Sequence, residues 1–300
     1  MKKILGLTLV LTLLLTGTLA ATVDTSQADA LYEIDSFSQA EALLEAQLTQ
    51  VNNNADRAQI LWRLARLQVS LGDELDENDK EGRFAFYEKG EQYALQSIEA
   101  NASYEGYLWK CSNIGRWGQT KGPLNALGKA KGMLEDLTTI VNTLGVVDSS
   151  ETWYVLSSLY DELPGGFLSF GNKEWAVSYM RIAMDTIPSH LYYPAHYQKL
   201  AEELYARNWS ASKRSKEMRS MEKDWNKASS NLEKYRYYEG KDGGKSKPFY
   251  SSVTLDSMSD RQEAVMVLSY ALAKATMLEP LKESDAVVVE EIKQLVDDWT

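Results

Sequence analysis

Apolar residues recur every three or four positions along most of this chain, which is the spacing of one face of an α-helix. The clearest examples are AEALLEAQLTQ at 40–50, RAQILWRLARLQVSL at 57–71, KEWAVSYMRIAMDTI at 173–187 and QEAVMVLSYALAKATMLE at 262–279. Clusters of glycine, proline, asparagine and aspartate separate these segments, and the alternation typical of strands is nearly absent. The pattern predicts an all-α fold built from helix pairs.

Tryptophan marks a repeat within this pattern. Trp62, Trp109 and Trp153 each stand near the start of a helical segment, and they lie 47 and 44 residues apart. After the third, Ala176 and Pro188 occupy positions where the second helix of a tetratricopeptide repeat carries a small residue and ends. A standard unit has about 34 residues. We therefore expect a tetratricopeptide-like solenoid of four to five helix pairs, stretched mainly by longer turns inside each pair.

The last third of the chain departs from the repeat. The segment after Trp209 is highly charged, and we expect one long, largely solvated helix followed by a mobile loop at 239–258. Two closing helices near 259–279 and 284–299 are expected to cap the array, so that its last apolar face is covered. The sequence thus predicts a single helical domain over 21–300.

The first twenty residues have a composition of their own. Lys2 and Lys3 precede an apolar run from Ile4 to Leu15, and small residues then lead to Ala20. This is the layout of a secretory signal peptide, and the run is short for a bilayer core of about 30 Å. No lipoprotein-type cysteine follows, so we expect signal-peptide cleavage after residue 20 and a soluble periplasmic protein.

Charge and motif content argue against several function classes. The net charge of −11 disfavours nucleic-acid binding. The order of Lys121 and Gly122 does not fit a phosphate-binding loop, and His190 and His196 are six apart rather than the four of a helical metal pair. Cys111 has no partner cysteine for a disulfide. We expect no enzymatic activity, no cofactor and no metal site.

The stretch GRWGQTKGPL at 115–124 is predicted to be the turn inside the second tryptophan-led pair. Gly115 and Gly118 would end the first helix, and Pro123 suits the first turn of the next. Arg116 and Trp117 would then stand at the rim of a groove. A purely structural turn explains the stretch about as well.

A binding groove follows from the repeat, because the first helix of each pair in such arrays faces the concave side. Groove positions lie four and seven residues after each tryptophan. Together with Trp117 and the three tryptophans themselves, they give the candidate ligand-binding residues Trp62, Arg66, Trp109, Asn113, Arg116, Trp153 and Tyr160. The two remaining groove positions are Val69, seven residues after Trp62, and Ser157, four residues after Trp153. Flat apolar surfaces beside a cation suit an amphiphile that ends in a carboxylate. Core packing explains any single tryptophan equally well.

Three segments resemble the T-component proteins associated with TRAP transporters, the tripartite ATP-independent periplasmic carriers. They are LWRLARL at 61–67, YALQSIEANASYEGYLWKCSNIGRWGQTKGPLNAL at 93–127 and LPGGFLSFGNKEWAVSYMRIAMDTIP at 163–188, within a similarity that covers about 30–215. The same pattern is shared more loosely with microtubule-dynamics-regulator-like repeat proteins.

The TRAP resemblance implies a non-enzymatic, exported transport accessory. Such a protein would act beside a periplasmic solute-binding protein, bind a small organic or hydrophobic ligand and form homotrimers. The alternative is a periplasmic scaffold that takes a peptide or protein partner in its groove, as tetratricopeptide arrays commonly do.

If residues 1–20 are a cleaved signal, the mature chain should begin near Ala21 and be recovered from the periplasmic fraction without detergent. Sequencing of the mature N-terminus and fractionation check this. A chain that retains Met1, or that is found only in the membrane fraction, would contradict the prediction.

Overall fold

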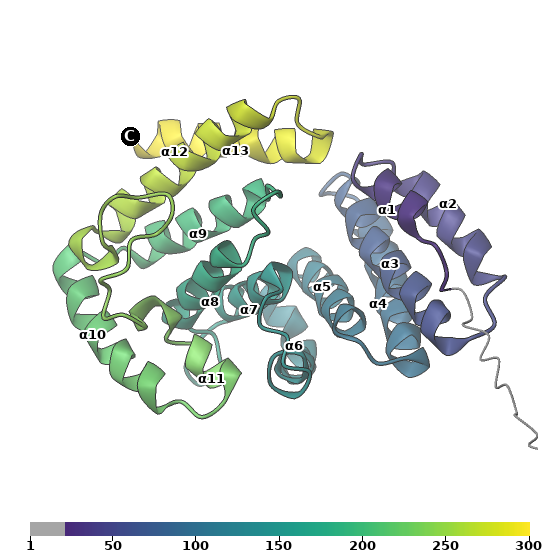
Figure 1. The fold of residues 1–300 in the computed structure, drawn as a ribbon, viewed down its shortest axis with the longest axis horizontal. Helices are drawn as coiled ribbons and strands as arrows, with labels where there is room; N and C mark the ends of the chain where they lie inside the picture. Colours follow the sequence, from purple (N-terminus) through teal and green to yellow (C-terminus); the bar gives the residue numbers. More distant parts are fainter. Residues whose placement is uncertain (1–21) are drawn as a thin grey trace, which may run out of the picture.

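The computed structural model describes residues 22–300, which form an arch of thirteen α-helices and contain no β-strand (Figure 1). This confirms the all-α, helix-pair solenoid. The predicted signal peptide lies outside the described residues and stays a prediction. The α-helices are α1 (Ser26–Tyr32), α2 (Phe37–Leu48), α3 (Asn54–Asp73), α4 (Lys80–Ala100), α5 (Tyr104–Lys121), α6 (Pro123–Thr138), α7 (Ser150–Glu162), α8 (Lys173–Asp185), α9 (Pro194–Arg207), α10 (Ala211–Lys227), α11 (Asn231–Tyr235), α12 (Asp260–Leu278) and α13 (Glu283–Trp299).

Short turns of other geometry join some of these helices. The π-helical turn η1 (Thr139–Thr143) follows α6, and the 3₁₀ turns η2 (Tyr238–Gly240) and η3 (Leu255–Ser257) lie between α11 and α12. None of the helices formed by residues 22–300 has both the length and the apolar character that a membrane crossing requires.

Side-chain caps set where the main helices begin. Asn53, Ser103, Ser149 and Asn172 precede α3, α5, α7 and α8, and each accepts a hydrogen bond from a backbone amide in the first turn. Such a cap satisfies an amide that has no partner within the helix and contributes about 1 kcal/mol. The polar residue before each apolar segment thus fixes the start of each helix.

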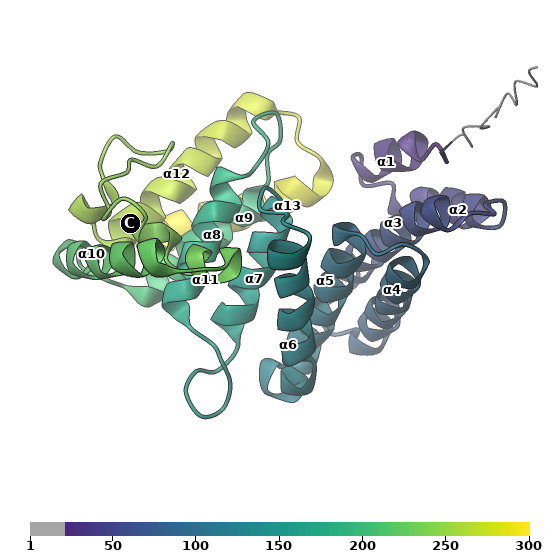
Figure 2. The same cartoon turned by 60° about the horizontal axis from the view of Figure 1, so that its bottom comes forward.

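The repeat is longer than a standard unit for two different reasons. In the α3–α4 pair the helices themselves are long, with 20 and 21 residues. In the α7–α8 pair the connecting loop is long, and it projects from the body in Figure 2. Two backbone hydrogen bonds hold the base of this loop together. The amide of Gly171 donates to the carbonyl of Pro164 at 3.1 Å, and the amide of Asn172 donates to the carbonyl of Tyr160 at 2.8 Å. Longer turns therefore explain only part of the stretch.

The fifth helix pair is formed by α9 and α12, which are distant in sequence. The hydroxyl of Tyr192, before α9, donates to the carbonyl of Ala271 at 2.9 Å, and the amide of Trp209, after α9, donates to Asp260 at 2.8 Å. The two helices therefore run antiparallel, and the charged segment is an insertion between them. The bounds predicted for both closing helices are close to those of α12 and α13, but α12 completes a pair and only α13 follows it.

The turn predicted at 115–124 is shorter than expected. Helix α5 continues to Lys121, and the chain reverses at Gly122, whose φ of +94° favours glycine. Gly118 lies inside the helix, where a Cβ atom would come within 3.0 Å of the Cβ of Ala126 on α6. Gly118 therefore permits close approach of two helices rather than ending one, whereas Pro123 does begin the next helix.

A buried network of six charges organises the C-terminal half of the arch. Its members are Arg181 on α8, Arg207 on α9, Arg214 on α10, Glu239 in η2, and Asp260 and Glu263 on α12. Arg181 and Arg214 both contact Oε2 of Glu263, at 2.7 and 2.6 Å. Arg207 contacts Glu239 at 2.6 Å and Asp260 at 2.8 Å. Three positive charges thus face three negative ones with almost no solvent exposure.

This network changes the expectation of a solvated helix and a mobile loop. Arg214, Met218 and Met221 give α10 a buried face. Within the predicted loop 239–258, Glu239 lies in the network, and the hydroxyl of Tyr250 donates to Glu263 at 2.7 Å. The segment is therefore packed against α8, α10 and α12.

The two ends of the arch meet. Asp35, between α1 and α2, accepts hydrogen bonds from the backbone amide of Ser284 at 2.9 Å and from its hydroxyl at 3.1 Å. Ser284 lies in the first turn of α13, whose amides have no partners within the helix. Asp35 thus caps a helix that lies 249 residues away in the sequence (Figure 1).

Substitution Glu263→Gln should lower the free energy of unfolding by about 3–5 kcal/mol, because it leaves buried arginines without a counter-charge. The matched control is Glu290→Gln, which removes a carboxylate from the exposed pair with Lys293 and should cost no more than about 1 kcal/mol. Urea unfolding of both variants measures the difference, and equal losses would show that the network adds little.

Stability should also fall in acid. Burial alone would raise the pKa of Glu263, but Arg181 and Arg214 lower it to about 2, below the usual 4.5. The stabilisation by this carboxylate is therefore complete above the unfolded pKa and is lost as the pH falls towards 2. Urea unfolding from pH 7 to pH 2 should show a smaller acid loss for Glu263→Gln than for the unsubstituted chain.

Candidate functional site

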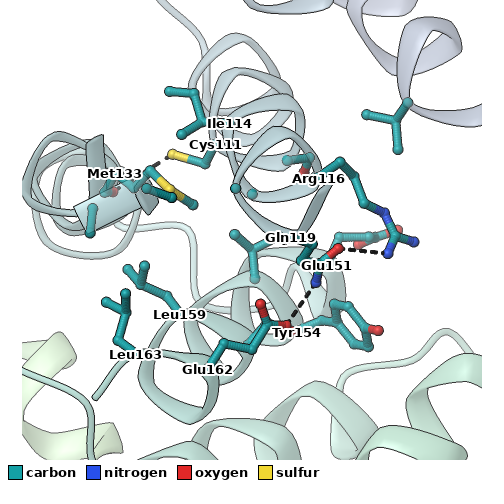
Figure 3. Close-up of a pocket in the computed structure, with 18 of the residues that line it drawn as sticks. Cys111, Ile114, Arg116, Gln119, Met133, Glu151, Tyr154, Leu159, Glu162 and Leu163 are labelled. Carbon is teal, nitrogen blue, oxygen red and sulfur yellow. Dashed lines mark hydrogen bonds between the residues drawn. The ribbon is translucent and has the colours of Figure 1, made fainter. Parts of the chain in front are cut away.

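A cavity of 210 Å³ extends between α5 and α7, from α6 on one side to residues of α3 and α9 on the other. Its inner wall is apolar, and Figure 3 shows the labelled members of this wall on the side away from Arg116. The wall residues are Cys111, Ile114, Ala126, Ala130, Met133, Leu159 and Leu163. Gly115 also borders the cavity, and it leaves space there because it carries no side chain.

The other end of the cavity is polar. Arg116 contacts Asp73 at 2.9 Å and donates to the side-chain oxygen of Gln119 at 3.0 Å. The amide of Gln119 in turn donates to Glu162 at 2.7 Å, as drawn in Figure 3. Burial alone would lower the pKa of Arg116, but the Asp73 carboxylate offsets this and the pKa is raised. The Asp73 carboxylate is shared with Arg83, which lies 3.6 Å from its other oxygen.

His196 on α9 borders the same cavity and is only 7% exposed. Its Nε2 lies 3.3 Å from the hydroxyl of Ser150, whereas Nδ1 has no hydrogen-bond partner among the described residues. Burial lowers the pKa of the imidazole to about 3, so the ring is neutral at physiological pH. One buried ring nitrogen is thus left for another group to satisfy.

The single cysteine is in the wall of the cavity but is not activated. Burial raises the pKa of the Cys111 thiol well above its usual value, and the sulfur lies 3.6 Å from the carbonyl oxygen of Met133. A thiol of this kind is a poor nucleophile. Among residues 22–300, no three histidine, cysteine, aspartate or glutamate side chains come together where they could hold a metal ion.

The structure brings two of the residues predicted from the tryptophan spacing to the cavity. Trp109 and Arg116 border it, together with Val69, the groove position predicted seven residues after Trp62. Trp62 and Arg66 lie further along the arch on α3. There Arg66 is paired with Asp29 at 2.8 Å, and its guanidinium lies 5.5 Å from the centre of the Trp62 ring.

The other four predicted residues do not border the cavity. Trp153 and Tyr160 are buried and pack against Tyr179. Asn113 is also buried, and its side-chain amide joins α5 to α3 through the carbonyl of Ala65, at 2.9 Å. Trp117 turns to α4, where its indole nitrogen donates to Glu88 at 3.1 Å. A ligand in the cavity would not touch these side chains.

The cavity residues that the sequence analysis did not predict include four with polar or charged groups from helices beyond α5, namely Glu151, Tyr154, Glu162 and His196. Tyr154 directly follows Trp153, and one residue rotates the side-chain direction on a helix by about 100°. In the stretch TWYVLSSLY, Leu156 and Tyr160 follow Trp153 by three and seven residues, and this apolar stripe is a signal that Trp153 faces the core. The sequence around His196 carries no comparable signal.

Filling the cavity should stabilise the protein. Ala130→Leu places a larger apolar side chain in open space, and cavity filling commonly adds about 0.5–2 kcal/mol. The matched control is Ala183→Leu, a substitution at a fully buried core position that does not border the cavity and should cost about 1–3 kcal/mol. Thermal unfolding distinguishes the two, and a loss of stability in Ala130→Leu would show that the space is not available.

A model of the family described as Regulator of microtubule dynamics protein 1-3 matches residues 24–137 of this chain. The matched part begins just before α1 and ends in the last turn of α6, so it covers the first three helix pairs. No curated protein matches the chain. The matched helices supply Trp109, Arg116 and the apolar wall, whereas Glu151, Tyr154, Glu162 and His196 come from helices beyond the match.

This match corrects the assignment to the TRAP T-components, which was wrong. The transport function, the solute-binding-protein partner, the small transported ligand and the homotrimer came with that resemblance and are withdrawn with it. The periplasmic location was inferred from residues 1–20 and stays a prediction. The export prediction rests on the composition of residues 1–20 and is independent of the match. The chain is similar, over residues 24–137, to regulators of microtubule dynamics.

Proposed function

We propose that this chain is a non-enzymatic binding protein that regulates microtubule dynamics, as the description of the matched family says of its members. The observation that carries the proposal is the match over residues 24–137, which coincides with three complete helix pairs. We further propose that a protein partner docks at the cavity between α5 and α7, where the third matched pair meets α7.

The size and lining of the cavity support docking of a single side chain. Sites for small molecules usually measure about 300–1,000 Å³, and this cavity has 210 Å³. Protein interfaces commonly depend on a few large side chains that enter apolar pockets surrounded by polar residues. The apolar wall of α5, α6 and α7 and the polar end at Arg116 and Glu162 fit that arrangement.

The polar groups of the site support a role without catalysis. Ser150 and His196 form a serine–histidine pair at 3.3 Å, but Ser150 is buried. In a catalytic triad a carboxylate orients the histidine through Nδ1. Here Nδ1 has no such partner among the described residues. Cys111, the other candidate nucleophile, is held as a neutral thiol by burial.

Co-pelleting with stabilised microtubules tests the proposal. The purified chain should pellet with the filaments and alter the rate at which tubulin polymerises. Ala130→Leu should weaken pelleting by about ten-fold or more, because burial of a large apolar side chain contributes ~1.5–3 kcal/mol. The control Ala286→Leu makes the same change at an exposed position on α13 and should pellet normally.

A chain that does not pellet would overturn the microtubule role. Normal pelleting of Ala130→Leu would show that the partner docks elsewhere. The proposal also requires contact with microtubules, so a cleaved export leader would count against it, and sequencing of the N-terminus tests that point separately.

A further inference from the structure

The geometry points to one class of partner for this cavity, a protein segment in which a large apolar residue is flanked by lysine or arginine. The inference rests on the proposed function, since it identifies the occupant of the same site. It is carried by three features of the cavity: its apolar wall, two carboxylates without ion-pair partners and one unsatisfied buried nitrogen.

The two carboxylates belong to Glu151 and Glu162 of α7, and both border the cavity. Glu151 accepts a hydrogen bond from the hydroxyl of Tyr193 at 3.4 Å, and Glu162 accepts one from Gln119 at 2.7 Å. Neither forms an ion pair within the described residues, although twenty-one ion pairs occur there. The two residues thus leave a negative charge beside an apolar space, and a cation on the partner would complement it.

The one cation at the cavity does not reverse this preference. Arg116 faces Asp73 at 2.9 Å, a carboxylate that it shares with Arg83 at 3.6 Å, whereas two carboxylates without ion-pair partners border the same cavity. A carboxylate bound by Arg116, as the sequence analysis expected, would lie near Asp73 and near Glu162, which Gln119 links to Arg116. The sign of the charge around the cavity favours a cationic partner.

Aromatic rings reinforce the same choice. Trp109 and Tyr154 both border the cavity and are partly exposed. A lysine or arginine that approaches the face of such a ring is attracted by the negative charge of its π-system. The two tryptophan-led helices thus offer both the apolar contact for the central residue and a surface for its flanking cations.

The unsatisfied nitrogen of His196 indicates that the occupant also carries a polar group. His196 borders the cavity, and its Nδ1 is buried and has no partner among the described residues. A hydrocarbon would leave it unpaired, whereas a peptide has an amide N–H and a carbonyl next to every side chain. A protein segment can therefore fill the apolar wall and satisfy His196 at the same time.

Three capped peptides test the inference by isothermal titration calorimetry with the full chain. The central residue and the flanking charges vary independently in Gly-Lys-Phe-Lys-Gly, Gly-Glu-Phe-Glu-Gly and Gly-Lys-Gly-Lys-Gly. The first should bind at least about ten-fold more tightly than either of the others, because only it supplies both the apolar side chain and the cations. Equal binding of the first two, or no binding of the first, would overturn the inference.

Two double variants test whether Glu151 and Glu162 cause the preference for the lysine peptide. In the double variant that carries Glu151→Gln and Glu162→Gln, the ratio of the affinities for the lysine and glutamate peptides should fall by about ten-fold. The preference should persist in Glu283→Gln with Glu290→Gln, which removes two exposed carboxylates from α13. Loss in both variants would show a general effect of net charge and would also overturn the inference.

The inference and the proposed function can fail separately. If Ala130→Leu weakens pelleting but the lysine peptide is not preferred, only the inferred class of partner is contradicted. A clear lysine preference without pelleting would leave the binding site in place and remove the microtubule role.

Discussion

Three buried arginines and three buried carboxylates determine how the C-terminal half of this protein is arranged. Desolvation of a charge costs several kcal/mol, so none of these groups is stable in the interior without its partners. Because they come from α8, α9, α10, η2 and α12, the network can form only when all five elements are in place. It thereby holds the insertion against the repeat and fixes α8, the partner of α7 in the helix pair that forms one side of the cavity.

The parts of the fold that depend on local sequence could be predicted. Apolar periodicity and polar caps lie within one helix, so the all-α class, the helix pairs and the bounds of the last two helices follow from short windows. The network does not, because Arg181 and Glu263 are 82 residues apart and no local pattern joins them. A charged segment such as 210–258 therefore reads as solvated until its partners on α8 and α12 are known.

The residues of the candidate site could also be predicted only in part from local sequence patterns. Of the three residues that the spacing predicted on α5, Trp109 and Arg116 border the cavity, whereas Asn113 is buried against α3. At α7 the equivalent tryptophan turns into the core and Tyr154, its neighbour, takes the cavity position. Large aromatic side chains stabilise a core as well as an interface, so residue type alone cannot decide the rotation of a helix. The match to the first three pairs likewise stops short of α7 and α9, so the residues of this chain that lie beyond it complete the site.

The contact between Asp35 and Ser284 has a consequence for how this architecture can change in evolution. An open solenoid can lengthen or shorten by whole repeats, because each unit contacts only its neighbours. Here the first helix pair and the last helix are also neighbours. Duplication or deletion of one helix pair would move the two ends apart and leave the first turn of α13 without its cap. A change in the number of repeats would therefore require a new cap for α13, whereas a change in a loop or in the insertion between α9 and α12 would leave this contact in place.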